Sequence, residues 1–421
     1  MAELAGVRHA RVSTPQGDSG VLAYEDGRYL FTYPPDAPPA ADISLLMPHR
    51  AEQYASLALH PIFQMNLPEG YVLEQLRNRL AKATPLDPML LLVLTGREAA
   101  IGRVRVEAPE LEASLGAGRF TGKGESLKSI LAWDGAEDLF NALAQRYLFR
   151  TGVSGVQPKV LVPETPELAV AGKASLATSD LIVKSGSADF PGLAVNEYVC
   201  MSAVKAAGLP VPDFHLSDNH QLFVMRRFDR LPDAGSLGFE DMAALMGKGT
   251  SEKYDSSYER VARCVEMFCA EDHHVSGLAQ LFDQVALSCI LGNGDAHLKN
   301  FGVLYSDPSQ NDVRLAPAYD IVNTTAYIRD DQLALTLGGS KSLFASRSLL
   351  LEFASRCRVA EPAVRITQLL EAVESELVLQ RDLLATVPDV RAALKESFDG
   401  FANRFAQRVS GDRVESQPKQ P

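Results

Sequence analysis

The chain has 421 residues, of which 46% are hydrophobic, and its formal net charge is −12 at pH 7. This length is sufficient for two domains with hydrophobic cores, whereas the negative charge argues against direct, non-specific binding of nucleic acid. The N-terminus lacks the apolar core of a signal peptide, and no apolar run is long enough to predict a membrane span. The five cysteines are scattered without a C-x-x-C spacing, as expected of reduced structural thiols. We therefore expect a soluble cytoplasmic protein.

The first part of the chain, residues 1–110, predicts a small α+β unit that is rich in strands. Residues 7–33 alternate in strand fashion and contain two turn signals, which is typical of β-hairpins. The remaining elements follow in chain order: a proline-rich loop at 34–42, an amphipathic helix at 70–83, a short buried helix or strand at 87–96, and a strand at 101–108.

The rest of the chain predicts two lobes of unequal type. Residues 111–148 form a connector with one helix. Residues 149–232 predict strands around a glycine turn, one amphipathic helix and a further strand. Residues 233–409 predict a helical lobe, with residues 239–291 mainly helical, and residues 410–421 predict a disordered tail. Two unequal lobes are expected to leave a ligand-binding cleft.

The segment LGNGDAHLKNFGVLY (291–305) places polar residues between a helix-like run and a strand-like run. Asp295 and Asn300 lie five positions apart, and Asp320 follows a predicted strand pair that returns the chain. Asn300 and Asp320 supply oxygen ligands of the kind that suits Mg²⁺ bound to phosphates. Asp295 is then left to orient a hydroxyl group and accept its proton. This arrangement is typical of enzymes that transfer phosphoryl groups.

Phosphate groups need further partners, and residues 151–186 supply candidates. The turn Thr151-Gly152-Val153-Ser154-Gly155 lies between two strand-like runs and could cover phosphates with backbone N–H groups, although a plain hairpin turn would look the same. Lys184 is centred on an apolar strand, and phosphate oxygens with Glu197 on the next helix would pair its charge. A lysine that reaches solvent near a strand end, and an ordinary solvated glutamate, remain the alternatives.

Taken together, these motifs resemble the HipA family of bacterial serine/threonine protein kinases, the toxins of toxin–antitoxin pairs. The resemblance spans nearly the whole chain and implies a two-lobed, protein-kinase-like α+β fold. The segments that carry it are TGVSGVQPKVLV (151–162), LIVKSG (181–186), NEYVCMSAVKAAGLPVPD (196–213), FVMRRFDR (223–230), NGDAHLKNFGVLY (293–305), LAPAYDIV (315–322) and LTLGGSK (335–341).

The resemblance implies a role for each residue of the catalytic loop. Asp295 would be the catalytic base, and Lys299 would steady the γ-phosphate. Asn300 and Asp320 would bind Mg²⁺, and Lys184 would contact the phosphates of ATP. His297 is interpreted as a structural residue of the loop, because Asp295 already fills the role of base.

The resemblance also implies the position of the adenosine part of ATP. Arg226, Arg227 and Phe228 would form the hinge over adenine through backbone groups, and Asp229 would lie near the ribose. Arg226 stands where some members of the family carry an acidic residue. Backbone hydrogen bonds would survive that change.

Another departure concerns self-inactivation, which in HipA kinases commonly proceeds by phosphorylation of a serine in the glycine-rich loop. Gly152 occupies the position of the best-known such serine. Ser154 and Thr151 are the remaining candidates, so the sequence leaves open whether and where the chain phosphorylates itself. A phosphate there would repel ATP.

We therefore expect an ATP- and Mg²⁺-dependent kinase that acts on serine or threonine of a protein. By resemblance, its target is a translation factor such as an aminoacyl-tRNA synthetase. Its partner is a small helix-turn-helix antitoxin of the HipB type, through which any contact with DNA would be indirect. Two alternatives stay open: a small-molecule kinase of the aminoglycoside or choline type, and a catalytically idle kinase-like co-repressor. The sequence leaves the oligomeric state open.

Overall fold

The computed structural model describes residues 7–80, 86–96, 100–109, 124–134, 138–151, 157–165, 180–186, 189–231, 235–343 and 346–415. The chain divides into two compact units that are discontinuous in sequence. The first unit comprises Met1–Ala188, Pro212–Glu252 and Gly302–Val313, and the second comprises Asp189–Val211, Lys253–Phe301 and Arg314–Pro421. Each unit therefore combines segments that the sequence alone assigned to different domains.

The first unit begins with a five-stranded antiparallel sheet of strand order β4-β3-β2-β1-β5. The predicted turn at Glu25-Asp26-Gly27 is confirmed, because Glu25 pairs with Arg28 and the two residues between them have φ angles of 47° and 75°. Such positive values are the geometry of tight hairpin turns. The strands are β1 (His9–Thr14), β2 (Gly17–Glu25), β3 (Arg28–Thr32), β4 (Tyr54–Ser56) and β5 (Arg105–Glu107), which is shorter than expected.

Short helices follow in the same unit, and the sequence explains their ends. Residues 87–96, which predicted either a helix or a strand, contain helix α3 (Pro88–Thr95). The helix begins here because Asp87 accepts a hydrogen bond of 2.9 Å from the N–H of Leu90 and Pro88 occupies the first turn. Leu76 of α2 is fully buried, as its spacing predicted. The other helices of this unit are α1 (Pro61–Gln64), α2 (Gly70–Leu80), α5 (Leu127–Leu131), α6 (Leu139–Tyr147) and α8 (Met242–Leu245), with 3₁₀ turns η1 (Pro39–Ala41), η2 (Leu148–Arg150) and η3 (Thr250–Glu252).

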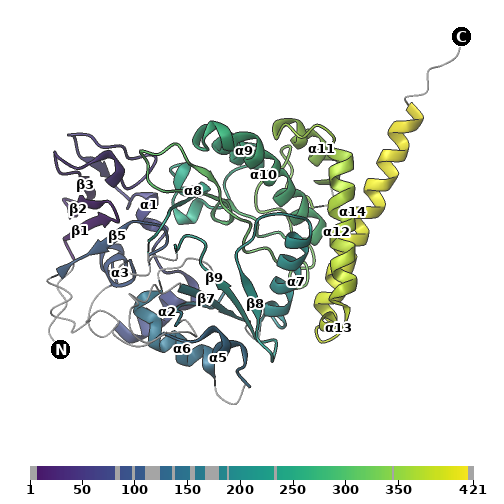
Figure 1. The fold of residues 1–421 in the computed structure, drawn as a ribbon, viewed down its shortest axis with the longest axis horizontal. Helices are drawn as coiled ribbons and strands as arrows, with labels where there is room; N and C mark the ends of the chain where they lie inside the picture. Colours follow the sequence, from purple (N-terminus) through teal and green to yellow (C-terminus); the bar gives the residue numbers. More distant parts are fainter. Residues whose placement is uncertain are drawn as a thin grey trace, which may run out of the picture. The chain divides into compact units, whose positions relative to one another are not determined.

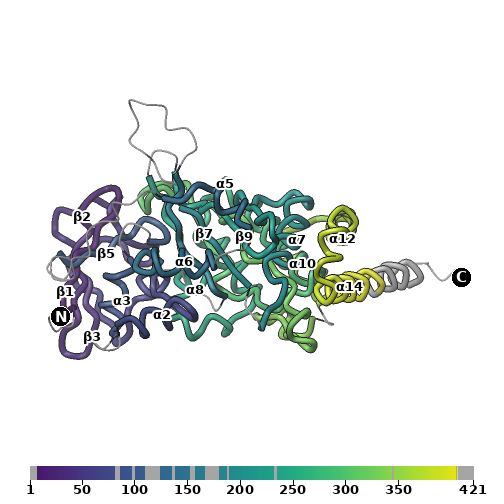
Figure 2. Tube along the Cα trace, turned by 90° about the horizontal axis from the view of Figure 1, so that it is seen from below, coloured from purple at the N-terminus to yellow at the C-terminus, as the bar shows by residue number. Residues whose placement is uncertain are grey.

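A second sheet of the first unit has the order β6-β7-β9-β8 and is antiparallel (Figures 1 and 2). One face of its central strands joins α6 in a hydrophobic cluster that includes Phe140, Tyr147, Leu181 and Val183. The strands are β6 (Lys159–Pro163), β7 (Asp180–Ser185), β8 (Phe214–Leu216) and β9 (Leu222–Arg226).

Residues 239–291 are mainly helical, as predicted, but their first three residues belong to a strand. Residues Gly238–Asp241 form strand β10, which pairs antiparallel with β11 (Gly302–Tyr305). The reason is tertiary, since the buried carboxylate of Glu240 accepts hydrogen bonds from Ser44 (2.7 Å), the N–H of Leu45 (2.8 Å) and Tyr305 (2.7 Å). These donors come from distant parts of the chain, so the local pattern could not reveal the strand.

A buried ion cluster joins the β5 region to the end of β9. Arg227 is completely buried and binds Asp180 (3.0 Å), both oxygens of Asp229 (2.9 and 2.6 Å) and the carbonyl of Ala100 (2.6 Å). Burial alone would raise the pKa of Asp229, but the charge of Arg227 holds that pKa below its usual value. Fully hydrogen-bonded pairs of this kind are costly to break, because removal of one partner leaves a buried charge.

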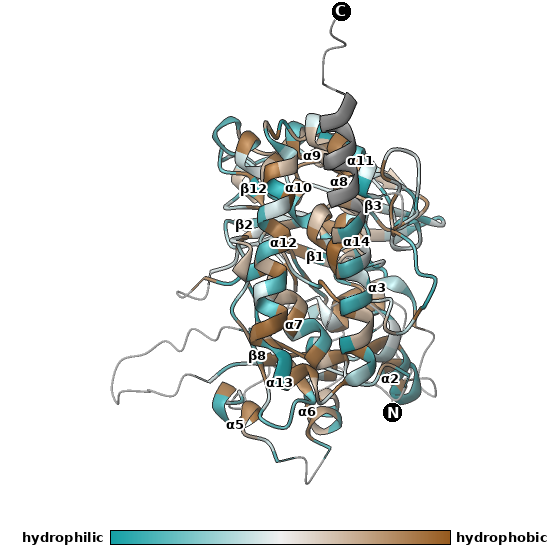
Figure 3. Cartoon of the chain, turned by 90° about the vertical axis from the view of Figure 1, so that its right-hand side faces the viewer, coloured by the Kyte–Doolittle hydropathy of each residue, from teal (hydrophilic) through white to brown (hydrophobic). Residues whose placement is uncertain are grey.

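The second unit is mainly helical. Helix α10 is its longest fully described helix, and α7, α9, α11, α12 and α14 pack against it. Helices α12 and α14 lie side by side in Figures 1 and 3, and Figure 3 shows hydrophilic and hydrophobic stretches alternating on both, as in amphipathic helices. The elements are α7 (Leu193–Ala206), α9 (Tyr258–Phe268), α10 (Glu271–Leu291), η4 (Leu298–Asn300), β12 (Arg314–Leu315), α11 (Ser346–Arg356), α12 (Pro362–Leu379), α13 (Arg381–Leu384) and α14 (Pro388–Glu415).

Two further expectations changed. The second strand of the predicted pair before Asp320 is only the two residues of β12, and the chain then runs in loop conformation. Helix α14 continues to Glu415, beyond the predicted start of the tail at residue 410. All five cysteines are buried and free, as expected. In the described part of the chain, no helix has the length and apolar character needed to cross a bilayer.

Candidate functional site

The loop that carries Asp295 begins where helix α10 ends. Gly292 caps the helix with a φ of 71° and its N–H binds the carbonyl of Ser288, a conformation that favours glycine. The side chain of Asn293 then accepts a hydrogen bond of 3.0 Å from the N–H of Asp295. This turn directs the chain into η4. The glycine at the end of the helix and the Asx turn after it therefore set the position of the polar residues of the loop.

A second set of contacts holds the loop from the side. Gly294 donates a hydrogen bond of 2.7 Å to the hydroxyl of Thr324, which itself binds the carboxylate of Asp331. A side chain at position 294 would collide with Asp331 and with the carbonyl of Gln332. The glycine of NGD is therefore required by close packing rather than by a positive φ.

Asp295 combines solvent exposure with a fixed side chain. Its side chain is 49% exposed, and its Oδ1 accepts a hydrogen bond of 2.8 Å from the hydroxyl of Tyr254. The Nε2 of His297 lies 3.9 Å from the same oxygen. An exposed, oriented carboxylate can accept a proton from a hydroxyl group, as the sequence predicted for Asp295.

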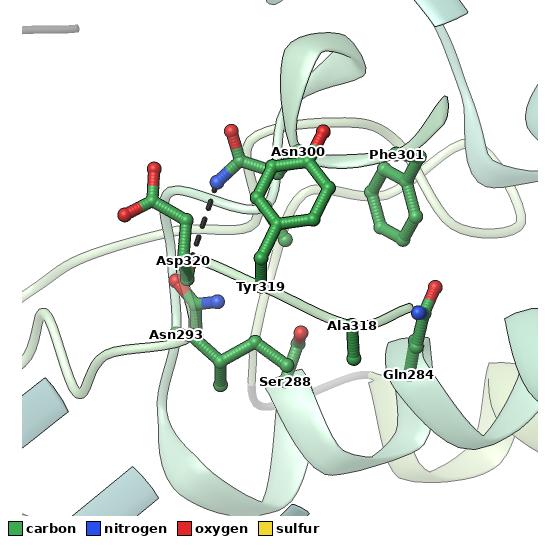
Figure 4. Close-up of a pocket in the computed structure, with 10 residues that line it drawn as sticks. Gln284, Ser288, Asn293, Asn300, Phe301, Ala318, Tyr319 and Asp320 are labelled. Atoms are coloured by element: carbon green, nitrogen blue, oxygen red, sulfur yellow. Dashed lines mark hydrogen bonds between the residues drawn. The ribbon is translucent and has the colours of Figure 1, made fainter. Parts of the chain in front are cut away.

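Asn300 and Asp320 are brought together, as the sequence predicted. The Nδ2 of Asn300 donates to the carbonyls of Asp295 (3.0 Å) and Asp320 (3.4 Å), and Figure 4 shows the amide nitrogen directed at the backbone of Asp320. Asp320 has a φ of 58°, an unusual value outside glycine, and its carboxylate extends away from Asn293 in Figure 4. The two carbonyls fix the orientation of the Asn300 amide, which leaves Oδ1 as its ligand atom.

The donor chemistry of this pair suits a hard cation. Among the described residues, no three His, Cys, Asp or Glu side chains gather at a distance that would hold a metal ion. One amide oxygen and one carboxylate instead resemble the sparse protein ligands of Mg²⁺, whose coordination shell is completed by phosphate and water. Asn300 and Asp320 are therefore the residues that could hold a metal ion here.

Lys299 and His297 flank these residues. Lys299 is half-buried, and its carbonyl accepts a hydrogen bond of 2.7 Å from the hydroxyl of Tyr319. Burial, together with the nearby charge of Lys253, lowers the pKa of His297 to about 3. A neutral imidazole packed against Tyr254 agrees with the structural role expected for His297.

Glu197 is buried in helix α7 of the second unit. The preceding residue, Asn196, binds the backbone of Asn323 on both sides, accepting from its N–H (2.9 Å) and donating to its carbonyl (2.8 Å). Asn323 follows Asp320 by three positions. The helix that carries Glu197 is therefore fixed to the segment that follows Asp320.

In the first unit, Lys184 lies on β7 with 3% exposure, directly opposite Lys159 of β6, which has 6% exposure. The Nζ of Lys184 lies 5.7 Å from the ring centre of Phe223. Two ammonium groups at paired positions of one sheet face repel each other, unless anions offset their charge. Lys159 was not among the residues predicted from the sequence, although its place in QPKVLVP, just before an apolar run, was a usable signal.

The glycine-rich loop is described only at its first residue. Thr151 is buried, and its hydroxyl accepts a hydrogen bond from the N–H of Leu161 and donates one to the carbonyl of Tyr147, both of 3.1 Å. The predicted phosphate-covering residues Gly152, Val153, Ser154 and Gly155 lie outside the described residues.

The predicted hinge residues have strong partners within the first unit. The N–H groups of Arg226 and Arg227 bind the carbonyls of Asp213 (2.8 Å) and Asp180 (3.1 Å), so an adenine contact would use other backbone groups. The guanidinium of Arg226 binds Glu164 at 2.6 Å. Phe228 packs edge-on against Phe239. The carboxylate of Asp229 binds Arg227 and the N–H of Gly102 (2.7 Å), and its contact with ribose stays a prediction.

Comparison with known proteins now identifies the family. Residues 10–107 match the model of the HipA N-terminal domain, and residues 151–379, more than half of the chain, match that of the HipA-like C-terminal domain. The chain belongs to the HipA family. The resemblance read from the motifs is thereby confirmed.

Two relatives of this HipA-family chain come from Sinorhizobium fredii. The protein named “Putative kinase Y4dM” is 26% identical over 418 residues, which cover 90% of this chain and 94% of that protein. The protein named “Putative kinase Y4mE” is 29% identical over 398 residues, which cover 88% of each chain. The family and these relatives together support a kinase-like enzyme.

A solved structure supports the fold. A chain in the complex of the Shewanella oneidensis toxin–antitoxin proteins HipA and HipB with operator DNA aligns with a TM-score of 0.64 at 17% identity. The alignment covers 94% of the HipA-family chain studied here and 98% of the other chain. The predicted fold, with a strand-rich N-terminal part and a helical C-terminal part, is confirmed.

The depressed pKa of His297 predicts how stability depends on pH. The unfolded chain takes up this proton near pH 6.5, whereas the folded chain excludes it until about pH 3, so stability falls as the pH drops through this window. Between pH 7 and pH 5 the loss attributable to His297 should be about 2 kcal/mol. His297→Phe should remove this part of the pH dependence in urea unfolding followed by circular dichroism. Parallel pH dependence in both proteins would contradict the assignment.

Proposed function

We propose that this chain is an ATP- and Mg²⁺-dependent kinase that phosphorylates serine or threonine residues of a protein. The observation that carries the proposal is the double hydrogen bond of the Asn300 amide, to the carbonyls of Asp295 and Asp320. It joins the loop of the exposed Asp295 carboxylate to the segment of Asp320, so a carboxylate and a pair of hard oxygen ligands lie near one another. Phosphoryl transfer needs a base and a metal site in this proximity.

In the proposed reaction, Asn300 and Asp320 hold Mg²⁺, which neutralises charge on the phosphates of ATP. The acceptor hydroxyl gives its proton to the carboxylate of Asp295, and its oxygen forms a bond to the γ-phosphorus. The bond between the γ-phosphorus and the bridging oxygen breaks, and ADP leaves with the electron pair. Lys299 would stabilise charge on the transferred group.

We assign Lys184 and Lys159 together to the phosphates of ATP. They occupy paired positions of β7 and β6 and are almost completely buried. Ammonium groups at neighbouring positions of one sheet face could both form charged hydrogen bonds with the oxygens of a polyphosphate. The pairing of Glu197 with Lys184 stays a prediction from the sequence.

For self-inactivation we propose Ser154 rather than Thr151 as the acceptor. The hydroxyl of Thr151 is buried and bonded to backbone on both sides, so its phosphorylation would break both bonds. A phosphate on Ser154 would place negative charge where the phosphates of ATP should bind.

The first test is transfer from labelled ATP in the presence of Mg²⁺, with the protein alone and with a cell lysate. Wild-type protein should label itself or a lysate protein, whereas Asp295→Asn should lose transfer by at least about a hundredfold because the proton acceptor is gone. Phosphopeptide mass spectrometry identifies the acceptor, including Ser154. Transfer only to a small molecule would replace the protein kinase with a small-molecule kinase. Absence of turnover with ATP bound would favour an idle co-repressor.

The lysine pair has its own test. Lys159→Met and Lys184→Met should each weaken binding of a non-hydrolysable ATP analogue by about tenfold or more, because each removes a hydrogen bond between charged groups. Lys128→Met serves as the matched control, since Lys128 is exposed on α5. Calorimetric titration gives the Kd values. Wild-type affinity in Lys159→Met would exclude this residue from the phosphate site.

We also propose that the chain acts as a toxin with a HipB-like helix-turn-helix partner. The support is family membership and the Shewanella complex, which contains HipA, HipB and operator DNA. A protein of the translation apparatus, such as an aminoacyl-tRNA synthetase, is the target that the family implies, and DNA would be reached only through the partner.

Expression in a bacterial host tests the toxin role. Induced wild-type protein should arrest growth, and Asp295→Asn, produced to the same level, should not, because the arrest depends on phosphoryl transfer. Colony counts after induction measure the effect. Equal arrest by both proteins would contradict a toxin that acts as a kinase.

A further inference from the structure

The contact between Tyr254 and Asp295 has no part in the reaction described above. The tyrosine hydroxyl donates a hydrogen bond of 2.8 Å to Oδ1 of the proposed base. Tyr254 is 42% exposed, so its ring contributes less to a hydrophobic core than a buried tyrosine would. Its polar end nevertheless meets the carboxylate that the proposed reaction uses as its base.

Tyr254 is held in place at both its ring and its backbone. The ring packs edge-on against His297, with 5.1 Å between ring centres. The Nζ of Lys341 donates to the carbonyl of Tyr254 (3.3 Å), and the carbonyl of Lys253 accepts from the N–H of Leu298 (3.1 Å). A hydroxyl on such an anchored ring has a defined position relative to the catalytic loop.

The segment around Tyr254 also connects the catalytic loop with the segment near residue 336. The hydroxyl of Tyr258 donates to the carbonyl of Ala296 (3.1 Å), beside the base. The backbone of Tyr258 and Ser256 bonds to that of Thr336, at 3.0 and 3.2 Å. Tyr254 therefore belongs to a segment bound to both parts.

We propose that Tyr254 is a positioning residue for phosphoryl transfer: its hydroxyl holds Oδ1 of Asp295, so that Oδ2 receives the proton of the acceptor hydroxyl. This inference rests on the proposed kinase function. The bond restricts rotation of the carboxylate about its side-chain torsions, so more encounters with the acceptor have reactive geometry. In the transfer step, the proton passes to Oδ2, the acceptor oxygen bonds to the γ-phosphorus, and ADP departs with the electrons of the broken bond.

The test compares wild type, Tyr254→Phe and Tyr54→Phe, with labelled ATP and dephosphorylated casein as the probe acceptor and with autophosphorylation as a second readout. Tyr254→Phe keeps the ring against His297 and removes only the hydroxyl. We expect its kcat to fall about tenfold, as for loss of a hydrogen bond to a charged group, while the KM for ATP and the Tm stay unchanged. Tyr54→Phe is the matched control, because Tyr54 donates its hydroxyl to the carbonyl of Pro48 in the N-terminal part.

A second measurement reports the contact without activity. In protein labelled with 3-fluorotyrosine, the ¹⁹F resonance of Tyr254 is assigned by its loss in Tyr254→Phe, and it should shift in Asp295→Asn. The positioning role would be overturned if the kcat of Tyr254→Phe equalled or exceeded that of wild type. A loss of Tm in step with kcat, or an unshifted resonance in Asp295→Asn, would overturn it as well. A wild-type protein that transfers no phosphate would overturn the proposed function itself, whereas an active wild type isolates the role of Tyr254.

Discussion

The second, mainly helical unit of this molecule depends on a pair of fully buried amides, Asn196 and Asn323. Each uses its amide group on backbone: Asn196 binds both polar groups of residue 323, and Asn323 donates to the carbonyl of Leu291 (2.6 Å) at the end of α10. Buried amides are stable only when such bonds are complete. One pair thus fixes three chain segments relative to one another: the helix with Glu197, the start of the catalytic loop, and the chain just after Asp320.

In the loop that follows α10, a different interaction fixes each side chain. Backbone carbonyls orient the Asn300 amide, an aromatic hydroxyl approaches Asp295, and burial keeps His297 neutral. In the first unit, buried charges are paired in a network around Arg227. Lys159 and Lys184 are also buried there, at paired positions of neighbouring strands. Charges buried in this way are expensive in free energy, which is why they tend to mark ion networks or ligand sites.

Local patterns predicted much of this arrangement. The spacing of Asp295 and Asn300, followed by Asp320, indicated one site, and the hydrogen bonds of Asn300 join all three. The β2–β3 hairpin, Lys184 on its strand and the α7 helix also followed from short-range signals. The sequence did not predict Lys159 or Tyr254. Lys159 lies opposite Lys184 only because of the register of two strands, and Tyr254 reaches Asp295 only through a side-chain contact between distant segments.

The sequence by itself determined the elements whose causes are local, because turns, caps and apolar periodicity act over a few residues. It also determined the family, because the motifs stand in a characteristic order. Only the tertiary structure decided that residues 238–241 form a strand, since the donors that satisfy Glu240 come from residues 44, 45 and 305. Only the tertiary structure brought a tyrosine hydroxyl to Asp295, because a contact across 41 positions leaves no periodic trace in the chain.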